Sequence, residues 1–261
     1  SLSTNQYTKT GYTFTAWNTK ADGSGAGYVD EKEVKNLTST QGAKVNLYAR
    51  WKANTYSVVY NGNGKTGGTM SNSSHTYDQA KNLSANQYTK TGYTFKSWNT
   101  KADGSGTTYT NAKEVKNLTS TNGANINLYA QWTPNTYTVK YNSNHATSGT
   151  TADTAHTYDV SKPLRENDYL RDGWKYMGWN TKADGTGTTY ADQQSVKNLA
   201  STNGAVVNLY AQWNKAPSLL TTNKVYYENE ISEQAWLNNY RMKNIRADDL
   251  EDGDISNDIR I

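Results

Sequence analysis

Two histidines stand in an identical motif whose residue types could carry out acid–base chemistry. His75 and His156 each begin the segment His-Thr-Tyr-Asp, which places a carboxylate three residues after the imidazole. A carboxylate can orient a histidine that acts as a general base. On an alternating strand, however, residues i and i+3 point to opposite faces, and no Gly-x-Ser-x-Gly motif or paired metal-ligand spacing accompanies them. The sequence therefore predicts a surface or strand-pairing role for both histidines, no catalytic residue and no enzymatic activity.

The segment Asp-Gly-(Ser/Thr)-Gly occurs three times, beginning at Asp22, Asp103 and Asp184, and superficially resembles a phosphate-binding loop. A phosphate-binding loop ends in Gly-Lys-(Ser/Thr) and leads into a helix, and neither feature follows these segments. Gly and Asp in this pattern supply the positive-φ positions of a tight turn. We therefore expect three hairpin turns.

The carboxylates between Asp248 and Asp254 form an acidic cluster that could bind calcium. With Gly253 at the sixth position of an EF-hand loop, the third position is Leu250 and the twelfth is Ile259, where a bidentate glutamate is needed. The EF-hand interpretation therefore fails. An irregular inter-domain calcium site and a solvated turn both stay open for this cluster.

The composition excludes several further classes of function. Cysteine is absent, which excludes disulfides and thiolate metal sites, and we predict no metal or cofactor. The net charge of +4, from 27 basic and 23 acidic residues, is too weak to indicate a nucleic-acid partner. The chain has no run of about 20 apolar residues, so we expect no membrane insertion.

Aromatic residues are abundant and uneven in kind, with 21 Tyr and 8 Trp against 2 Phe. Exposed rings could stack on sugars, and under that hypothesis the candidate glycan-stacking residues are Trp98, Trp132, Trp179 and Trp213. Under the opposing hypothesis the rings form the core, because apolar residues make up only 34 % of the chain and each buried aromatic side chain contributes about 1.5–3 kcal/mol. We expect Trp98 and Trp132 to be core residues.

The aromatic positions belong to an internal repeat. Segment 5–51 recurs at 86–132 with 36 of 47 positions identical. The elements Trp-Asn-Thr-Lys-Ala-Asp-Gly and Leu-Tyr-Ala-(Arg/Gln)-Trp each occur three times at steps of 81 residues, marked by Trp17, Trp98 and Trp179 and by Trp51, Trp132 and Trp213. Periods of this kind are typical of tandem arrays.

The period divides the chain into four parts. Residues 54–134 and 135–215 are two complete repeats, and 1–53 is an incomplete first repeat without the first strand and hairpin, because Ser1 aligns with Asn82. Residues 216–261 differ in composition, with 5 basic and 9 acidic residues. This start within a repeat is what we expect for a piece of a longer protein.

Each complete repeat begins with a period-two segment, Tyr56–Tyr60 or Tyr137–Tyr141, that predicts a strand. A Gly/Asn-rich turn follows, and a second strand around His75–Asp78 should pair with the first. Leu83–Gln87 is predicted as a short helical turn or loop. Val115–Leu118 should form a short apolar bridge.

The second half of the repeat should contain two further strands. In Gly92–Trp98 the alternation places Tyr93, Phe95 and Ser97 on one face and Trp98 at the end of the strand. Ile126–Trp132 should close the repeat. The sequence thus predicts a mainly β fold of the α+β class, built largely from antiparallel strands.

Three motifs resemble a known family. They are Gly92-Tyr93-Thr94-Phe95-x-x-Trp98, Asp103-Gly104-x-Gly106 and Leu128-Tyr129-Ala130-Gln131-Trp132. Residues 1–214 resemble the Listeria–Bacteroides repeat, the family that includes the internalin B-repeats. The resemblance implies tandem β-grasp-like units on bacterial cell-surface proteins, between a distal binding module and a wall or membrane anchor. The third copy departs from the pattern at Trp174 and Tyr176, which keep aromatic bulk.

The C-terminal segment, after the linker Asn214-Lys215-Ala216-Pro217, resembles the opening of a bacterial Ig-like domain. The resemblance rests on the Asp-x-x-Asp-Gly-Asp turn at 249–254 and covers fewer than 50 residues.

These observations predict a non-enzymatic stalk of a secreted, cell-wall-associated bacterial surface protein, whose repeats contact mainly their neighbours. The alternative is an adhesive module in which repeated surfaces bind a host or cell-wall glycan or protein, with multivalency strengthening weak contacts.

Overall fold

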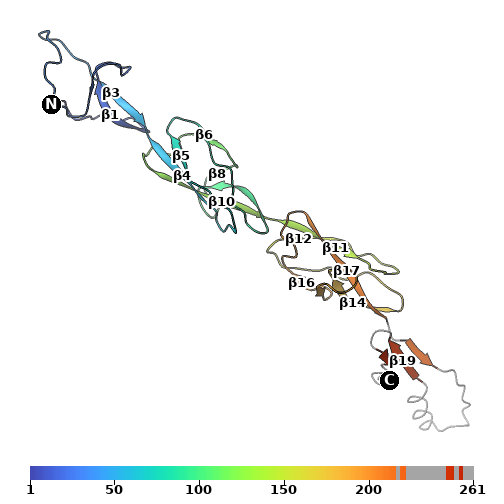
Figure 1. Ribbon diagram of the computed structural model, residues 1–261. Helices are drawn as coiled ribbons and strands as arrows, with labels where there is room; N and C mark the ends of the chain where they lie inside the picture. Colours follow the sequence, from blue (N-terminus) through green and yellow to red (C-terminus); the bar gives the residue numbers. More distant parts are fainter. Residues whose placement is uncertain (216–217, 222–244, 250–252, 255–261) are drawn as a thin grey trace, which may run out of the picture. The chain divides into compact units, whose positions relative to one another are not determined.

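The computed structural model describes residues 1–215, 218–221, 245–249 and 253–254 (Figure 1). Every regular element in these residues is a β-strand. These described residues contain no helix that is long and apolar enough to cross a membrane. The α+β assignment was therefore wrong for the described chain, whose fold is all-β with three tandem repeats.

The first repeat contains a three-stranded antiparallel sheet. Its strands are β1 (Tyr12–Asn18), β2 (Gly27–Tyr28) and β3 (Tyr48–Ala53), in the order β2-β1-β3. Strand β3 is therefore an edge strand.

The second repeat adds a hairpin to the same plan. Its strands are β4 (Thr55–Asn61), β5 (Ser73–Thr76), β6 (Lys81–Asn82), β7 (Tyr93–Asn99), β8 (Thr108–Tyr109), β9 (Glu114–Val115) and β10 (Asn125–Pro134). Five of them form a sheet in the order β5-β4-β10-β7-β8, and β6 pairs with β9. The first and last strands, β4 and β10, lie side by side and are parallel, and all other pairs are antiparallel.

The third repeat has the same order of strands. They are β11 (Thr136–Asn142), β12 (Thr154–Thr157), β13 (Lys162–Pro163), β14 (Trp174–Asn180), β15 (Thr189–Tyr190), β16 (Ser195–Val196) and β17 (Ala205–Lys215). The sheet order is β12-β11-β17-β14-β15, and β11 and β17 are the parallel pair.

The core of the second repeat lies on one face of its sheet. Strand β4 supplies Tyr56, Val58 and Tyr60 in strict alternation, as the Tyr-x-Val-x-Tyr pattern predicts, and all three are buried. Trp98 lies fully buried among them, with its ring centroid 4.9 Å from that of Tyr60. Trp132 is half-buried and packs against this cluster.

The sequence left a short helical turn or a loop open at Leu83–Gln87, and the structure has no helix there. Instead, an irregular segment places two side chains into the core: Leu83 is 2 % exposed, and the Tyr88 hydroxyl donates a hydrogen bond to the Tyr60 carbonyl at 2.8 Å. The backbone N–H of Ser84 donates to the Tyr60 hydroxyl at 2.7 Å. Side-chain anchors thus replace the intrahelical bonds of a helical turn.

A β-bulge in β7 changes which of its side chains share a face of the sheet, so the faces predicted from regular alternation were wrong. Gln131 pairs with Ser97 and Trp132 pairs with Phe95, so Lys96 is an extra residue without a partner in the ladder. The extra residue brings Phe95 and Trp98 to the same face, with ring centroids 5.1 Å apart, whereas regular alternation would separate them. The first and third repeats have register shifts at the equivalent positions.

The C-terminal segment contributes a three-stranded antiparallel sheet, β18 (Ser218–Thr221), β19 (Ile245–Asp249) and β20 (Gly253–Asp254). Most of segment 216–261, and with it the predicted Ig-like domain, lies outside the described residues. The same holds for the side chains of the acidic cluster Asp248–Asp254, so its calcium binding stays a prediction.

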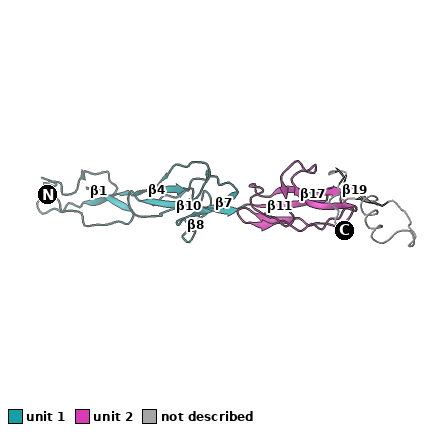
Figure 2. Ribbon diagram, turned by 90° about the horizontal axis from the view of Figure 1, so that it is seen from below, with its two compact units in different colours: residues 1–134 teal, residues 135–261 magenta. Residues whose placement is uncertain are grey.

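The described chain forms two compact units (Figure 2). The division falls between Pro134 and Asn135, where the period places the boundary of the second and third repeats. Unit 1 therefore contains the first two repeats, and the contacts between these two repeats lie inside one unit.

Candidate functional site: the junction between the first two repeats

A single residue, Asn54, separates the last strand of the first repeat from the first strand of the second. Its backbone N–H donates to the Gly11 carbonyl at 2.9 Å, and its own carbonyl accepts from the Tyr77 N–H at 2.8 Å. Gly11 belongs to the first repeat and Tyr77 to the second. The backbone of Asn54 therefore ties both repeats together.

The Asn54 side chain makes the same double connection. Its Oδ1 accepts a hydrogen bond from the Thr13 hydroxyl at 2.6 Å, and its Nδ2 donates to the Ser120 carbonyl at 2.7 Å. Asn54 is only 8 % exposed. Asparagine suits this position because its short side chain offers a donor and an acceptor at once.

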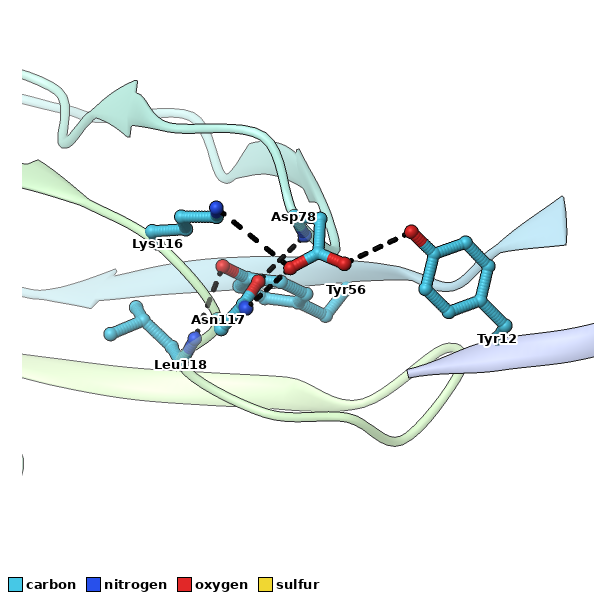
Figure 3. A network of polar contacts seen from close by, with 6 residues as sticks. All are labelled: Tyr12, Tyr56, Asp78, Lys116, Asn117 and Leu118. Carbon is cyan, nitrogen blue, oxygen red and sulfur yellow. Dashed lines mark hydrogen bonds and ion pairs between the residues drawn. The ribbon is translucent and has the colours of Figure 1, made fainter. Parts of the chain in front are cut away.

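A second set of polar contacts crosses the junction through Asp78 (Figure 3). The Tyr12 hydroxyl, from the first repeat, donates to Asp78 Oδ2 at 2.9 Å. From the second repeat, Asn117 Nδ2 donates to Asp78 Oδ1 at 2.9 Å, and Lys116 Nζ lies 3.9 Å from the same oxygen. The Asp78 N–H donates in turn to Asn117 Oδ1 at 2.6 Å.

These contacts shift two ionisation equilibria. Hydrogen bonds from Asn117 and Tyr12, together with the charge of Lys116, hold the pKa of the Asp78 carboxyl below its usual value. The hydrogen bond to Asp78 raises the pKa of the Tyr12 hydroxyl. Asp78 stays ionised at neutral pH, and Tyr12 stays a donor to it.

An aromatic contact completes the junction. The rings of Tyr12 and Tyr77 meet edge to face, with centroids 5.9 Å apart, and Lys9 Nζ lies 3.9 Å from the centroid of the Tyr12 ring. Gly11, with φ at +76°, makes room: a Cβ there would stand 2.2 Å from the Tyr77 ring. Only glycine allows this approach.

His75 and Asp78 are not brought together as a catalytic pair. His75 is 1 % exposed, its ring stacks on that of Tyr56 at 5.5 Å, and its Nε2 lies 2.9 Å from the Ser73 hydroxyl oxygen. Asp78 instead faces the junction. The strand-pairing role of His75 is confirmed by its register with Tyr56, and a surface location was wrong because the imidazole fills core space. His156 occupies the equivalent buried position.

Burial gives these histidines a pH dependence. Desolvation, reinforced by nearby Lys81 or Lys162, lowers the pKa of His75 and of His156. A histidine whose pKa is lowered by folding binds fewer protons in the folded state than in the unfolded chain, where its pKa is about 6.5. The contribution of these two histidines to the free energy of unfolding is therefore complete above about pH 6.5 and decreases as the pH falls below that value.

We expect the double substitution His75→Phe and His156→Phe to flatten this dependence. Phenylalanine keeps a ring against Tyr56 and Tyr137 but cannot be protonated. The measurement is the denaturant midpoint of both proteins between pH 7.5 and 5. An equal fall for wild type and double variant across this range would contradict the assignment.

The three Asp-Gly-(Ser/Thr)-Gly segments are turns, as predicted. In the second repeat, Asp103 Oδ1 accepts hydrogen bonds from the N–H and hydroxyl of Ser105 at 2.9 and 2.8 Å, and these bonds lower the pKa of Asp103. Sequence reasoning missed the residue behind the turn, Asn99. It is 1 % exposed, and its Oδ1 accepts from the N–H groups of Lys101 and Gly106.

The tryptophans considered for glycan stacking divide into two pairs. Trp98 and Trp179 are fully buried, so their rings present no face to a sugar. Trp132 and Trp213 are half-buried, and their Nε1 atoms donate to the carbonyls of Gly62 and Ser143 at 3.0 and 3.1 Å. Both pairs pack within or against the cores, because the small repeats have few other large apolar side chains.

Within the ranges that the structure describes, no group of three or more His, Asp or Glu side chains is close enough to hold an ion. The junction around Asn54 and Asp78 connects the first repeat with the second. Its hydrogen bonds position one repeat on the next.

Small all-β units in tandem, joined at Asn54 without a free linker, define a repeat protein. The chain belongs to the Listeria-Bacteroides repeat domain family, whose model matches residues 1–50, 56–131 and 137–212. The residues between the first two matches, 51–55, include Asn54. Sequence reasoning did not single out Asn54, although an Asn-Thr pair precedes each Tyr-x-Val-x-Tyr strand.

Two similar proteins are known from Evansella cellulosilytica (strain ATCC 21833 / DSM 2522 / FERM P-1141 / JCM 9156 / N-4). One is named "Putative Gly-rich membrane protein" and is 33 % identical over 174 residues, which cover 66 % of this chain and 19 % of that protein. The other is named "Putative membrane protein" and is 32 % identical over 178 residues, covering 67 % of this chain and 25 % of that protein. The chain thus spans a quarter or less of the length of these relatives.

Proposed function

We propose that the chain is a non-enzymatic stalk, a spacer in which successive repeats are held in fixed register to carry another domain away from the cell. The observation that supports this most directly is Asn54, whose four polar groups are all bonded, two to the first repeat and two to the second. A Gly/Ser-rich linker would leave the repeats free to reorient. A bonded, 8 % exposed single-residue connection resists that motion.

The sequence contains the residue types of this junction a second time. Tyr93, Asn135 and Asp159 stand 81 residues after Tyr12, Asn54 and Asp78. After the third repeat, where the sequence of residues 216–261 departs from the repeat, the corresponding positions hold Trp174 and Ala216. Tryptophan lacks the hydroxyl that Tyr12 donates, and alanine lacks the amide of Asn54. This pattern favours a role in joining repeats over a role within one repeat.

The proposed cellular setting is supported by the family and by the relatives. Repeats of this family occur in surface proteins, and the relatives carry membrane-protein names. We propose an extracellular, cell-wall-associated location, a likeness to internalin B-repeats, and a β-grasp-like unit. The last point is supported by the hairpin β4–β5 and by the parallel pairing of first and last strands.

A distance measured between two spin labels, one on each side of the junction, tests the stalk proposal. The chain has no cysteine, so Lys20→Cys with Lys101→Cys places one spin label at the same exposed position of the first and second repeats. Double electron–electron resonance should give a narrow, single-peaked distance distribution. Asn54→Ala should broaden it and cost about 1–3 kcal/mol, because buried partners lose their hydrogen bonds.

Asn86→Ala is the matched control. Asn86 bonds locally, with its side chain bonded to the N–H and carbonyl of Tyr88, so its loss should leave the distance distribution unchanged. A wild-type distribution as broad as that of Asn54→Ala would overturn the stalk proposal, because a freely jointed chain holds nothing at a fixed distance.

A further inference from the structure

A small polar hollow lies at the junction of the first two repeats, and we call it the junction hollow. It has a volume of about 160 Å³. The first repeat lines it with Thr13, Thr15 and Lys52, and the second lines it with Thr55 and Asn122. Both repeats therefore contribute side chains, and neither forms the junction hollow alone.

The junction hollow does not depend on the strand and hairpin with which a complete repeat begins. Lys52 lies near the end of β3, and its counterpart in the second repeat, Thr133, pairs with β7. The parallel neighbour β4 pairs with the other part of β10, Asn125–Tyr129. A first strand placed in this way beside β3 would therefore lie away from Lys52.

The side chains around the junction hollow offer hydrogen-bond donors that the protein does not use. Lys52 forms no ion pair with any residue that the structure describes, and its ammonium group has three N–H donors. Asn122 Oδ1 accepts a hydrogen bond from the Thr55 N–H at 3.1 Å. This bond fixes the Asn122 side chain and leaves its Nδ2 donors, together with the Thr55 hydroxyl, for a ligand.

The lining favours a small, negatively charged ligand. Lys52 is the one charged residue among those that line the junction hollow. A lysine ammonium binds phosphate as a point charge, and amide and hydroxyl donors beside it can bond further oxygens of the same group. The volume lies below the roughly 300–1,000 Å³ of sites for drug-sized molecules, so the junction hollow suits a single tetrahedral group.

The residue types of the junction hollow recur 81 positions later in the sequence. The unchanged residues Thr13, Thr55 and Asn122 correspond to Thr94, Thr136 and Asn203. The two other positions exchange their residues, because Thr15 and Lys52 correspond to Lys96 and Thr133. Each set thus keeps one lysine at a different position, as expected if the positive charge matters more than the packing of one side chain.

We infer that the junction hollow is a binding site for a phosphate-type oxyanion, either free inorganic phosphate or a phosphodiester group. Lys52 supplies the positive charge, and Asn122 Nδ2 and the Thr55 hydroxyl donate hydrogen bonds to the oxygens. Because Lys52 belongs to the first repeat and the other two residues to the second, the bound anion connects the repeats. The inference does not depend on the stalk function.

Residue-resolved NMR of the full chain tests the site, with inorganic phosphate and dimethyl phosphate as probes and sodium chloride at matched ionic strength as the reference. We expect saturable shifts of the Thr55 backbone amide and the Asn122 side-chain amide with phosphate and not with chloride. Saturation by dimethyl phosphate would show that the site accepts a phosphodiester, and saturation by inorganic phosphate alone would restrict it to the free ion. The absence of saturation with both probes would overturn the inference.

Protein variants separate the site from general attraction of anions. Lys52→Thr should weaken binding at least about tenfold, because a charge-assisted hydrogen bond is lost. Adding Thr15→Lys should restore binding, because the double variant has the arrangement of Lys96 and Thr133. Lys35→Thr, at an exposed position outside the junction hollow, changes the net charge equally and should leave binding unchanged. Equal binding by wild type and Lys52→Thr, or no recovery in the double variant, would contradict the proposed site.

Discussion

Trp98→Ala is expected to unfold the second repeat. Trp98 is fully buried, and its ring lies 4.9 Å from Tyr60, 5.1 Å from Phe95 and 6.2 Å from Tyr88 between centroids. Removing such a side chain costs about 3–5 kcal/mol. A domain of about 80 residues has roughly 4–12 kcal/mol in all, so one substitution removes a large share of the stability.

Guanidinium unfolding followed by near-UV circular dichroism measures this effect. Trp132→Ala is the matched control: Trp132 is half-buried and donates one hydrogen bond to the Gly62 carbonyl, so its loss should cost less than that of Trp98. A larger loss for Trp132→Ala would show that the core is centred on the other tryptophan.

Gly68→Ala is expected to have the second largest effect. Gly68 has φ at +78°, and a Cβ there would stand 2.0 Å from the backbone carbonyl oxygen of Gln87. Backbone cannot move aside as a flexible side chain can, so the loop must separate from its partner segment. The neighbouring bonds from the N–H groups of Thr66 and Gly67 to the Thr89 carbonyl would then be lost.

The expected cost of Gly68→Ala is about 2–4 kcal/mol, from the strained φ and from two or more lost hydrogen bonds. Gly123→Ala separates these two contributions. Gly123 has φ at +74°, but a Cβ at this position would meet nothing within 4 Å, so Gly123→Ala should show only the cost of the strained backbone. Equal destabilisation in urea unfolding would show that the contact with Gln87 contributes nothing.

Several features of the fold could be predicted from local sequence. The Tyr-x-Val-x-Tyr pattern predicted the buried face of β4 correctly. Side chains alternate along a regular strand because of its local backbone geometry, whatever the rest of the chain does. The turns at Asp22, Asp103 and Asp184 followed from the conformations that Asp and Gly adopt. The faces of β7 could not be predicted, because the bulge at Lys96 is defined by its pairing with the distant strand β10.

The candidate site was predictable only in part. The His-Thr-Tyr-Asp motif offers His75 and Asp78 as a pair, whereas in the structure His75 lies in the core and Asp78 lies at the junction. No local pattern in the sequence assigns a junction role to Asn54 or Tyr12. Their roles depend on partners far along the chain: 66 residues separate Tyr12 from Asp78, and 66 separate Asn54 from Ser120.

The sequence by itself determined that this protein is a tandem β-repeat array with aromatic cores and many tight turns. Each of those conclusions rests on identity between copies or on preferences of adjacent residues. The tertiary structure decided that β4 and β10 pair in parallel, that His75 is buried, and that Asn54 joins two repeats. The physical reason is that these features arise when distant segments meet and satisfy one another's hydrogen bonds, and no local preference specifies which segments will do so.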